Sequence, residues 1–241
     1  MAYDFLGLVN DINRRLNEVP LTSANFGSAV GFYSLGKDSV NASIRYINQS
    51  QFEWPFNHVE QEDDLTAGEI RYAYPADAKT IDFDSFRIKR NSTFGNETKK
   101  LSIIDYEEYL TSYVDAEYDT SNTGIRTIPR YVFRTPSQEF GVYPPPDNDY
   151  ELIYEYYRLP VDLENATDVP SVPEQFRYVI VDGAMYHAYL FRGNTQDAQM
   201  QLQKFEEGIK DMRTLYINRY HYIRDTRINA GLSYHVKSRV S

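Results

Sequence analysis

The chain has 241 residues, of which 41% are apolar and 25% charged; this excludes disorder of the whole chain and fits one large domain or two small ones. It contains no cysteine, which excludes disulfides and thiolate chemistry. Its formal net charge is −10, and this acidity argues against a body that grips nucleic-acid phosphates.

Two helices are predicted before residue 60. Apolar side chains recur at three- and four-residue steps over residues 3–19, and a proline ends this first helix. The Gly- and Ser-rich segment 21–36 is predicted to be a loop. A cap at Asp38 or Ser39 begins the second helix, which ends by Trp54-Pro55 because the residue before a proline disfavours helix.

From about residue 69 to residue 160 the apolar period changes to two, which predicts strands. The alternation slips near Ser85-Phe86, as a β-bulge would make it do. Segment 101–114 is ambiguous and is compatible with one short helix. Three clear strands follow, RYVFR, EFGVY and YELIYEYYRL, with turns at residues 135–138 and 144–148. One face of the last strand is shared by Tyr150, Leu152, Tyr154 and Tyr156.

Tyrosine is unusually common, with 22 copies. Tyrosine suits strands, and it suits surfaces that are half apolar and half wet. The composition therefore predicts either a tyrosine-rich β core or a large protein or sugar interface.

Two more helices follow the strands. Pro173 suits the first turn of a helix that continues to a stop at Gly193-Asn194. The next helix has an apolar stripe of heptad-like spacing, formed by Ala198, Leu202, Phe205, Ile209, Met212 and Tyr216. The stripe covers fewer than three heptads, so a helix pair within the chain is favoured over a long coiled coil.

These elements predict an α+β fold. Helices from both chain ends form a four-helix bundle, an antiparallel β-rich module is inserted into one bundle connection, and an extended arm follows. The predicted segments are the N-terminal helices (1–60), the inserted β-rich module (61–168), the C-terminal helices (169–217) and the extended basic C-terminal arm (218–241).

The charge is unevenly distributed. Residues 213–241 contain six Lys/Arg and one acidic residue, a net charge of +5, whereas the rest of the chain has a net charge of −15. A basic tail on an acidic body is typical of an interaction arm, and the alternative is a solvated terminus.

The sequence shows no signal-peptide pattern and no apolar run near the ~20 residues that span a bilayer, so a soluble protein made in a cytoplasm, without membrane contact, is expected.

Motifs for catalysis are lacking in the sequence. None of the four histidines, at positions 58, 187, 221 and 235, has metal-ligand spacing, and we expect His187 to be a core residue. No nucleophile elbow or phosphate-binding loop occurs. The candidate acid/base pairs are Asp63-Asp64, Asp82/Asp84, Glu107-Glu108 and Asp147/Asp149. Neighbours in sequence do not show the separation that a glycosidase needs, so no enzyme, metal or cofactor is predicted.

Four segments carry a resemblance to a known family. They are LVNDINRRLNEVPL (8–21), QFEWPFN (51–57), EFGVYPPPDNDYELIYEYYRLP (139–160) and VPEQFRYVIVDGAMYHAYLFRGNTQDAQMQLQKFEEGIKDMRTLY (172–216). In order and spacing the chain resembles the head-to-tail adaptor proteins of tailed bacteriophages, especially the podovirus tail-tubular or gatekeeper type. Between residues 60 and 127 only YAYPADAKTIDFDSFRI resembles the family.

The resemblance implies a non-enzymatic ring, commonly of twelve copies, at the head-tail junction of a virion. Such a ring docks on the portal protein, connects it to the tail nozzle or tube, and lets genomic DNA pass without specific binding. Its C-terminal arm reaches along the portal, and Arg and Tyr are enriched at interface hot spots. The expected portal contacts are Tyr216, Arg219, Tyr220, Tyr222, Arg224 and Arg227.

Two other functions stay open. The first is a tail-associated carbohydrate- or receptor-binding component, which requires exposed Tyr or Trp on one β face. The second is a glycan hydrolase, which requires a catalytic carboxylate pair.

Overall fold

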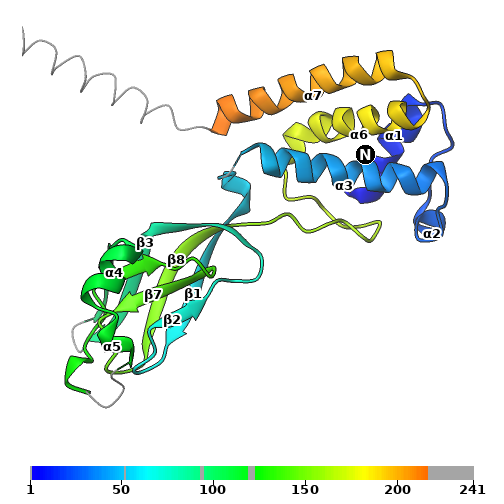
Figure 1. Cartoon of the computed structure of the whole chain (residues 1–241). Helices are drawn as coiled ribbons and strands as arrows, with labels where there is room; N and C mark the ends of the chain where they lie inside the picture. Colours follow the sequence, from blue (N-terminus) through cyan, green and yellow to red (C-terminus); the bar gives the residue numbers. More distant parts are fainter. Residues whose placement is uncertain (1, 52, 93–94, 119–122, 217–241) are drawn as a thin grey trace, which may run out of the picture. The chain divides into compact units, whose positions relative to one another are not determined.

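A computed structural model describes residues 2–51, 53–92, 95–118 and 123–216. The chain divides into two compact units, of which the helical unit is built from residues before 51 and after 162 and the β unit from residues 51–162. The β unit is therefore an insertion between the two halves of the helical unit, as the colours of Figure 1 show. The sequence predicted that the β module begins after residue 60 and ends at residue 168. In the structure the β unit begins after residue 50 and ends at residue 162.

The helical unit contains the four long helices that the sequence predicts, with different bounds. Its elements are α1 (Phe5–Arg15), α2 (Ser23–Phe26), α3 (Phe32–Ser50), the 3-10 helix η3 (Glu174–Phe176), α6 (Arg177–Phe191) and α7 (Thr195–Tyr216).

Two of these bounds correct the prediction. α1 ends at Arg15, before the proline, because Asn17 adopts a left-handed conformation with φ of 58°. α3 begins at Phe32, directly after Gly31 with φ of 64°, and α2 also lies in the segment predicted to be a loop. The Gly and Ser residues that suggested a loop are therefore partly helical, because tertiary packing overrides weak helix propensity.

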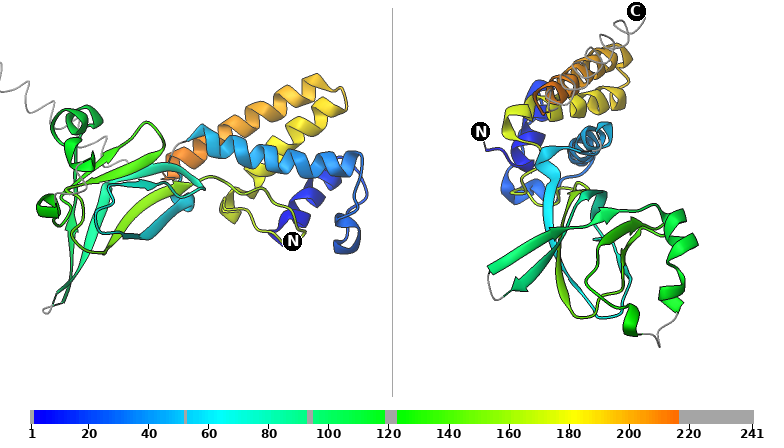
Figure 2. Two further views of the ribbon diagram at one scale, coloured as in Figure 1. Left: turned by 60° about the horizontal axis from the view of Figure 1, so that its bottom comes forward. Right: turned by 90° about the vertical axis from the view of Figure 1, so that its left-hand side faces the viewer.

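The apolar helix α6 is the centre of the helical unit. It contacts α1, α3 and α7, and Figures 1 and 2 show it lying between α7 and the two N-terminal helices. The close approach requires Gly183, because a Cβ there would lie 2.7 Å from the Phe205 ring of α7 and 2.8 Å from the Ser43 hydroxyl of α3. α3 and α7 also meet, through the Tyr46 and Phe205 rings 5.1 Å apart. The bundle geometry beyond these contacts stays a prediction.

The β unit consists of two four-stranded sheets with short helices. Its elements are η1 (Pro55–Asn57), β1 (His58–Leu65), β2 (Arg71–Ala73), β3 (Ala78–Ser92), β4 (Gly95–Lys100), β5 (Ser102–Ile103), α4 (Tyr106–Ser112), α5 (Asp115–Tyr118), η2 (Thr123–Ile125), β6 (Tyr131–Arg134), β7 (Glu139–Tyr143) and β8 (Tyr150–Arg158). Sheet A has the order β1-β8-β3-β4, and sheet B has the order β2-β7-β6-β5.

The sheets confirm the α+β class but correct the prediction that the β module is antiparallel throughout. All pairs are antiparallel except β5 with β6, which run parallel, so the module is mixed rather than purely antiparallel. The predicted bulge is confirmed, since the β3–β8 register shifts between Asp82 and Arg87. β1 was missed because half of its sequence, HVEQEDDL, is acidic.

The larger of two apolar clusters in the described part of the β unit contains residues from both sheets. It contains Leu65, Phe86, Ile88, Leu101, Val132, Phe140, Val142, Leu152, Tyr154 and Tyr156. The predicted shared face of β8 is confirmed, because three of its four residues are in this core and Tyr150 packs against it. The other face of sheet B is covered by α4, whose Tyr109 ring stacks 3.9 Å from Phe133.

Candidate interaction surfaces

The last turn of α7 is attached to two other parts of the helical unit. The Tyr216 ring lies 5.8 Å from the ring of the buried Phe176, and the Tyr216 hydroxyl accepts a hydrogen bond of 3.3 Å from Gln175 Nε2. One turn earlier, Arg213 Nη2 donates to the carbonyl of Ser50 at the end of α3. The segment after residue 216 therefore starts where α3, η3 and α7 meet.

Of the six predicted portal contacts, Tyr216 is the one within the described part of the chain, and its ring is half-buried. It also has a role within the helical unit, because its ring and hydroxyl hold the end of α7 against η3. The other five, Arg219, Tyr220, Tyr222, Arg224 and Arg227, lie outside the described residues.

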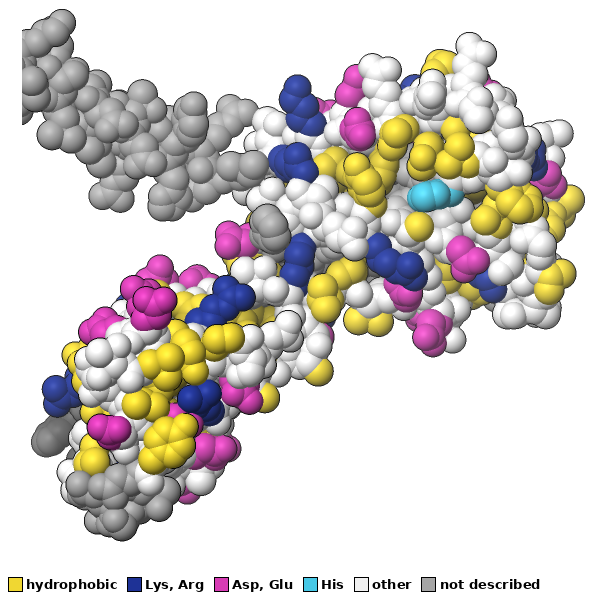
Figure 3. All heavy atoms as spheres, in the orientation of Figure 1, with side chains coloured by type: hydrophobic (Ala, Val, Ile, Leu, Met, Phe, Trp, Pro, Cys, Tyr) yellow, Lys and Arg dark blue, Asp and Glu magenta, His cyan; other side chains and the backbone are white. Residues whose placement is uncertain are grey.

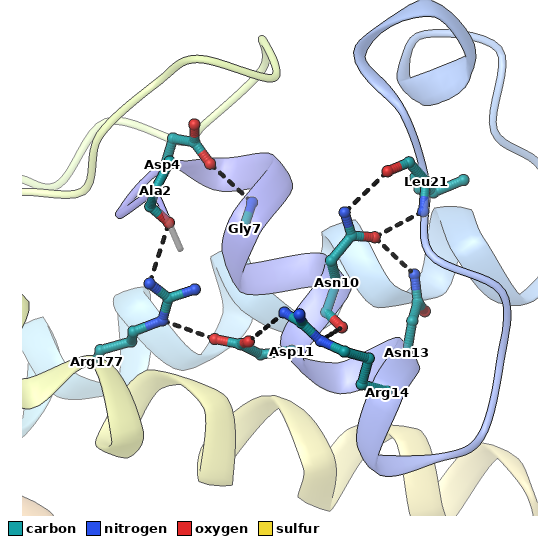
Figure 4. Close-up of polar contacts among 9 residues, drawn as sticks. All are labelled: Ala2, Asp4, Gly7, Asn10, Asp11, Asn13, Arg14, Leu21 and Arg177. Carbon is teal, nitrogen blue, oxygen red and sulfur yellow. Dashed lines mark hydrogen bonds and ion pairs between the residues drawn. The ribbon is translucent and has the colours of Figure 1, made fainter.

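The two halves of the helical unit are joined by charged hydrogen bonds between α6 and α1 (Figure 4). Arg177 Nε donates to Asp11 Oδ2 over 2.6 Å, and Arg177 Nη1 donates to the Ala2 carbonyl over 3.0 Å. The same Asp11 carboxylate accepts a hydrogen bond of 2.7 Å from Arg14. Such charge-assisted bonds fix the start of the chain to the helix that follows the insertion.

The connection after α1 is fixed by one side chain, Asn10, also drawn in Figure 4. Its Nδ2 donates to the Leu21 carbonyl over 2.8 Å, and its Oδ1 accepts from the Leu21 N–H over 2.6 Å. The amide thus satisfies both backbone groups of a loop residue, as a β-bridge would.

One end of the helical unit exposes apolar side chains. Val30 is 77% and Phe191 63% exposed, and the Phe191 ring lies 6.5 Å from Phe32 at the start of α3. The Arg192 guanidinium lies 4.7 Å from the Phe32 ring and forms an ion pair with Glu18. Figure 3 shows apolar side chains grouped on the visible face of the helical unit, whereas charged and apolar side chains alternate on the β unit. Exposed apolar groups of this kind mark protein contacts.

The outward face of sheet A is acidic on three adjacent strands. Glu155 of β8 stands directly opposite Glu60 of β1 on one side and opposite Asp82 of β3 on the other. Like charges directly opposite one another destabilise a sheet. His58 lies 3.0 Å from Glu155 and supplies the nearest basic side chain on β1.

The bulge in β3 leaves a hollow of about 390 Å³ on this acidic face. Its lining residues are Glu60, Asp82, Asp84, Ser85, Arg87, Thr98, Ile153, Tyr154 and Glu155. Sequence patterns did not predict this surface because it depends on β1, although the alternation of Glu60, Glu62 and Asp64 along the strand was a readable signal.

The inward tyrosines of the β unit bind carboxylates. Tyr154 donates to Asp63 Oδ2 over 2.6 Å, and Tyr156 donates to Asp77 Oδ1 over 2.9 Å. Burial, helped by the hydrogen bond to Asp63, raises the pKa of Tyr154 well above its usual range. These tyrosines belong to the core, so the alternating pattern reflects a tyrosine-rich β core and not an exposed aromatic face.

Two of the four candidate acid/base pairs are separated or engaged in other contacts, whereas Asp82 and Asp84 line the acidic hollow together. Asp63 and Asp64 are successive residues of β1 and face opposite sides of the sheet. Asp147 accepts a bond from Tyr150, and Asp149 accepts one from the Ala67 N–H. The bond from Ala67 joins the connection after β1 to the one before β8.

Histidine and metal chemistry find little support in the described ranges. His187 is half-buried on α6, where burial lowers its pKa, and its ring lies 5.0 Å from Tyr186. Within the described residues no cluster of three or more His, Cys, Asp or Glu side chains could hold a metal ion. None of the described helices is both long and apolar enough to cross a membrane.

A comparison with known families gives a match over most of the chain. Residues 3–229 match the model of a family described as SU10 adaptor protein, which covers nearly the whole chain. No curated protein matches the chain.

Proposed function

The chain belongs to the SU10 adaptor protein family, a family of phage head-tail adaptors, and from this premise we propose that it forms a ring at the head-tail junction of a tailed phage. The ring has twelve copies, as is common in the adaptors that the chain resembles, docks on the portal and connects it to the tail nozzle or tube. The family match over residues 3–229 carries this proposal. It supports a structural, non-enzymatic role and a location in the virion, after synthesis in the host cytoplasm.

The attachment of α7 supports portal binding by the residues that follow it. Tyr216 and Arg213 hold the last turn of α7 against η3 and α3, so the basic segment leaves the helical unit from a defined place. A segment that becomes ordered on its partner loses conformational entropy there, and a rigid attachment reduces that loss.

The acidic face of sheet A supports passage of DNA without specific binding. The carboxylates of Glu60, Asp82 and Glu155 stand in one row across three strands. Carboxylates repel phosphates, so DNA moving past such a surface would not be held.

A carbohydrate- or receptor-binding role has less support. That function requires aromatic side chains on an outer β face, whereas Tyr154 and Tyr156 face the core and Trp54 is 1% exposed. A glycan hydrolase gains no support from Asp63 and Asp64, which face opposite sides of β1, or from Asp147 and Asp149, which hold bonds within connections. Asp82 and Asp84 line the acidic hollow together, and this pair is the one that a hydrolase reading would have to use.

A truncation after Tyr216 tests the portal contact. We expect the truncated protein to bind portal about a hundredfold more weakly, because several hot-spot residues are lost together. Its melting temperature should stay within a few degrees of the full chain, since the packing of Tyr216 is kept.

A charge-matched pair of variants locates the contact within the segment. The double variant R219A/R224A should lose much of the affinity, whereas the control K237A/R239A, which also removes two positive charges, should lose little. Unchanged portal affinity of the truncated protein would contradict the proposed contact.

A further inference from the structure

A second hollow lies within the β unit and has the opposite character to the acidic one. It has a volume of about 300 Å³ and is lined by residues from both sheets. The lining residues are Tyr74, Ala78, Lys79, Thr80, Ile81, Phe83 and Arg134. Tyr74 follows β2, the next five belong to β3, and Arg134 ends β6.

The aromatic side chains that line this cavity are held in place by packing. The Tyr74 ring lies edge-on to Phe83 at 6.4 Å and stacks on the buried Phe140 at 6.3 Å. Phe83 in turn stacks on Phe86 at 5.3 Å. Rings fixed by neighbours lose little freedom when a ligand enters, which favours binding.

The charged groups that line the cavity are cationic. Lys79 and Arg134 both line it, and Lys79 Nζ donates to the Gln51 carbonyl over 2.7 Å. The lining set contains no carboxylate, although residues 51–162 contain 22 acidic residues and 11 Lys/Arg. Among the described residues Arg134 forms no ion pair. The exposed Arg134 guanidinium borders the cavity beside the Tyr74 hydroxyl, and its remaining donors can bind an anion that enters.

We propose that this cavity binds the C-terminal carboxylate of a partner chain together with an apolar last side chain. The volume is at the small end of the range for ligand sites, so it accommodates one anchoring side chain and its charged neighbour. Arg134 can bind the carboxylate in a bidentate manner, while Phe83, Ile81 and Ala78 contact the apolar part.

Nucleic acid fits this cavity less well. A polyanion that placed one phosphate here would bring its other phosphates close to a unit with twice as many acidic as basic residues. The apolar part of the lining, Ala78, Ile81 and Phe83, can contact an apolar side chain but offers nothing to a phosphate. Carboxylate binding in this cavity goes beyond the adaptor role and does not depend on it.

Small probes test the site on the full chain. Saturation-transfer difference NMR would follow N-acetyl-phenylalanine, with N-acetyl-phenylalaninamide as the neutral isostere. We expect the acid to bind saturably and the amide to bind about tenfold more weakly, since the charge-assisted hydrogen bonds are lost.

Matched variants place the binding in this cavity. Arg134→Gln should weaken binding of the acid about tenfold, and Ala78→Phe should abolish it by filling the space. The control Arg87→Gln removes a cation that lines the acidic hollow and should leave binding unchanged. Arg134 is exposed, so its variant should keep the fold even if the Ala78 variant does not.

Three results would overturn the proposal. The first is equal affinity for acid and amide, and the second is an equal loss in the Arg134 and Arg87 variants. The third is displacement of the acid by inorganic phosphate or a 12-base-pair duplex at an equal concentration, which would identify a phosphate or DNA site instead.

Discussion

At the level of single residues, the buried tyrosine hydroxyls of the β unit bind carboxylates. Tyr154 binds Asp63, Tyr156 binds Asp77, and Tyr109 donates to Glu117 over 2.9 Å. A buried phenol needs such a partner, because an unpaired polar group in a core is costly. Sequence alternation predicted the inward face of β8, but it could not predict Asp63, which lies on a strand that looked too acidic to be one.

Removing one hydroxyl tests this pairing. Tyr154→Phe should lower the free energy of unfolding by about 1–2 kcal/mol, because the Asp63 carboxylate loses a donor. The matched control is Tyr150→Phe on the same strand, whose hydroxyl binds the exposed Asp147 and whose loss should cost no more than about 0.5 kcal/mol. Urea unfolding measures both. Equal effects of the two substitutions would show that the buried pair adds nothing.

Three buried or half-buried tyrosines of the β unit, Tyr72, Tyr109 and Tyr154, predict a loss of stability at alkaline pH. Burial raises the pKa of Tyr72 to about 12 and those of Tyr109 and Tyr154 further. Below pH ~10 these phenols are neutral in the folded and unfolded states alike, so stability is fully retained. Above that pH the unfolded state releases protons that the folded state keeps, and stability falls as pH rises.

Urea titrations at pH 9 and pH 11, with tyrosinate absorbance as a second readout, check this expectation. Native protein at pH 11 should show fewer ionised tyrosines than protein in urea. Equal ionisation in the two states would mean that the buried phenols are not protected.

At the level of secondary-structure elements, the strands and helices that sequence predicts well are those with a clear apolar period. β6, β7 and β8 were identified, as were α6 and α7, because their apolar residues repeat without interruption. β1 and the first turns of α3 were missed for physical reasons. β1 is an edge strand whose outer side chains are acidic, so its sequence lacks a clear apolar alternation. The start of α3 contains Gly36, which has weak helix propensity and lies within contact distance of Val9.

Gly141 shows how a single position sets the distance between α4 and sheet B. A Cβ there would lie 2.1 Å from the Phe133 ring, which stands opposite Gly141 in register and is covered by Tyr109 on its other face. The ring has no free side toward which to move. Gly141→Ala should therefore destabilise the β unit by about 1–3 kcal/mol through overpacking.

The control for this substitution is Gly27→Ala. Gly27 has φ of −66°, and an alanine methyl group there would meet no neighbouring heavy atom within 4 Å, so the change should be neutral or slightly stabilising. Thermal unfolding followed by circular dichroism compares the two. A neutral Gly141→Ala would mean that α4 can shift at no cost.

For the molecule as a whole, the insertion divides structural roles between two units. The helical unit joins both chain ends around α6 and holds the start of the basic C-terminal segment. The β unit has its own core, an acidic outer face and a cationic cavity. The insertion and the uneven charge were predictable from sequence, whereas both hollows depend on side chains from separate strands and appear only in three dimensions.

The proposed assembly is an adaptor ring bound to portal. Native mass spectrometry of the protein mixed with the portal protein of the same phage, with each partner alone as control, is the decisive test. We expect a complex that contains many copies of this chain in a fixed ratio to portal, and twelve copies if the resemblance holds in full. Separate species at every salt and protein concentration would contradict the proposal.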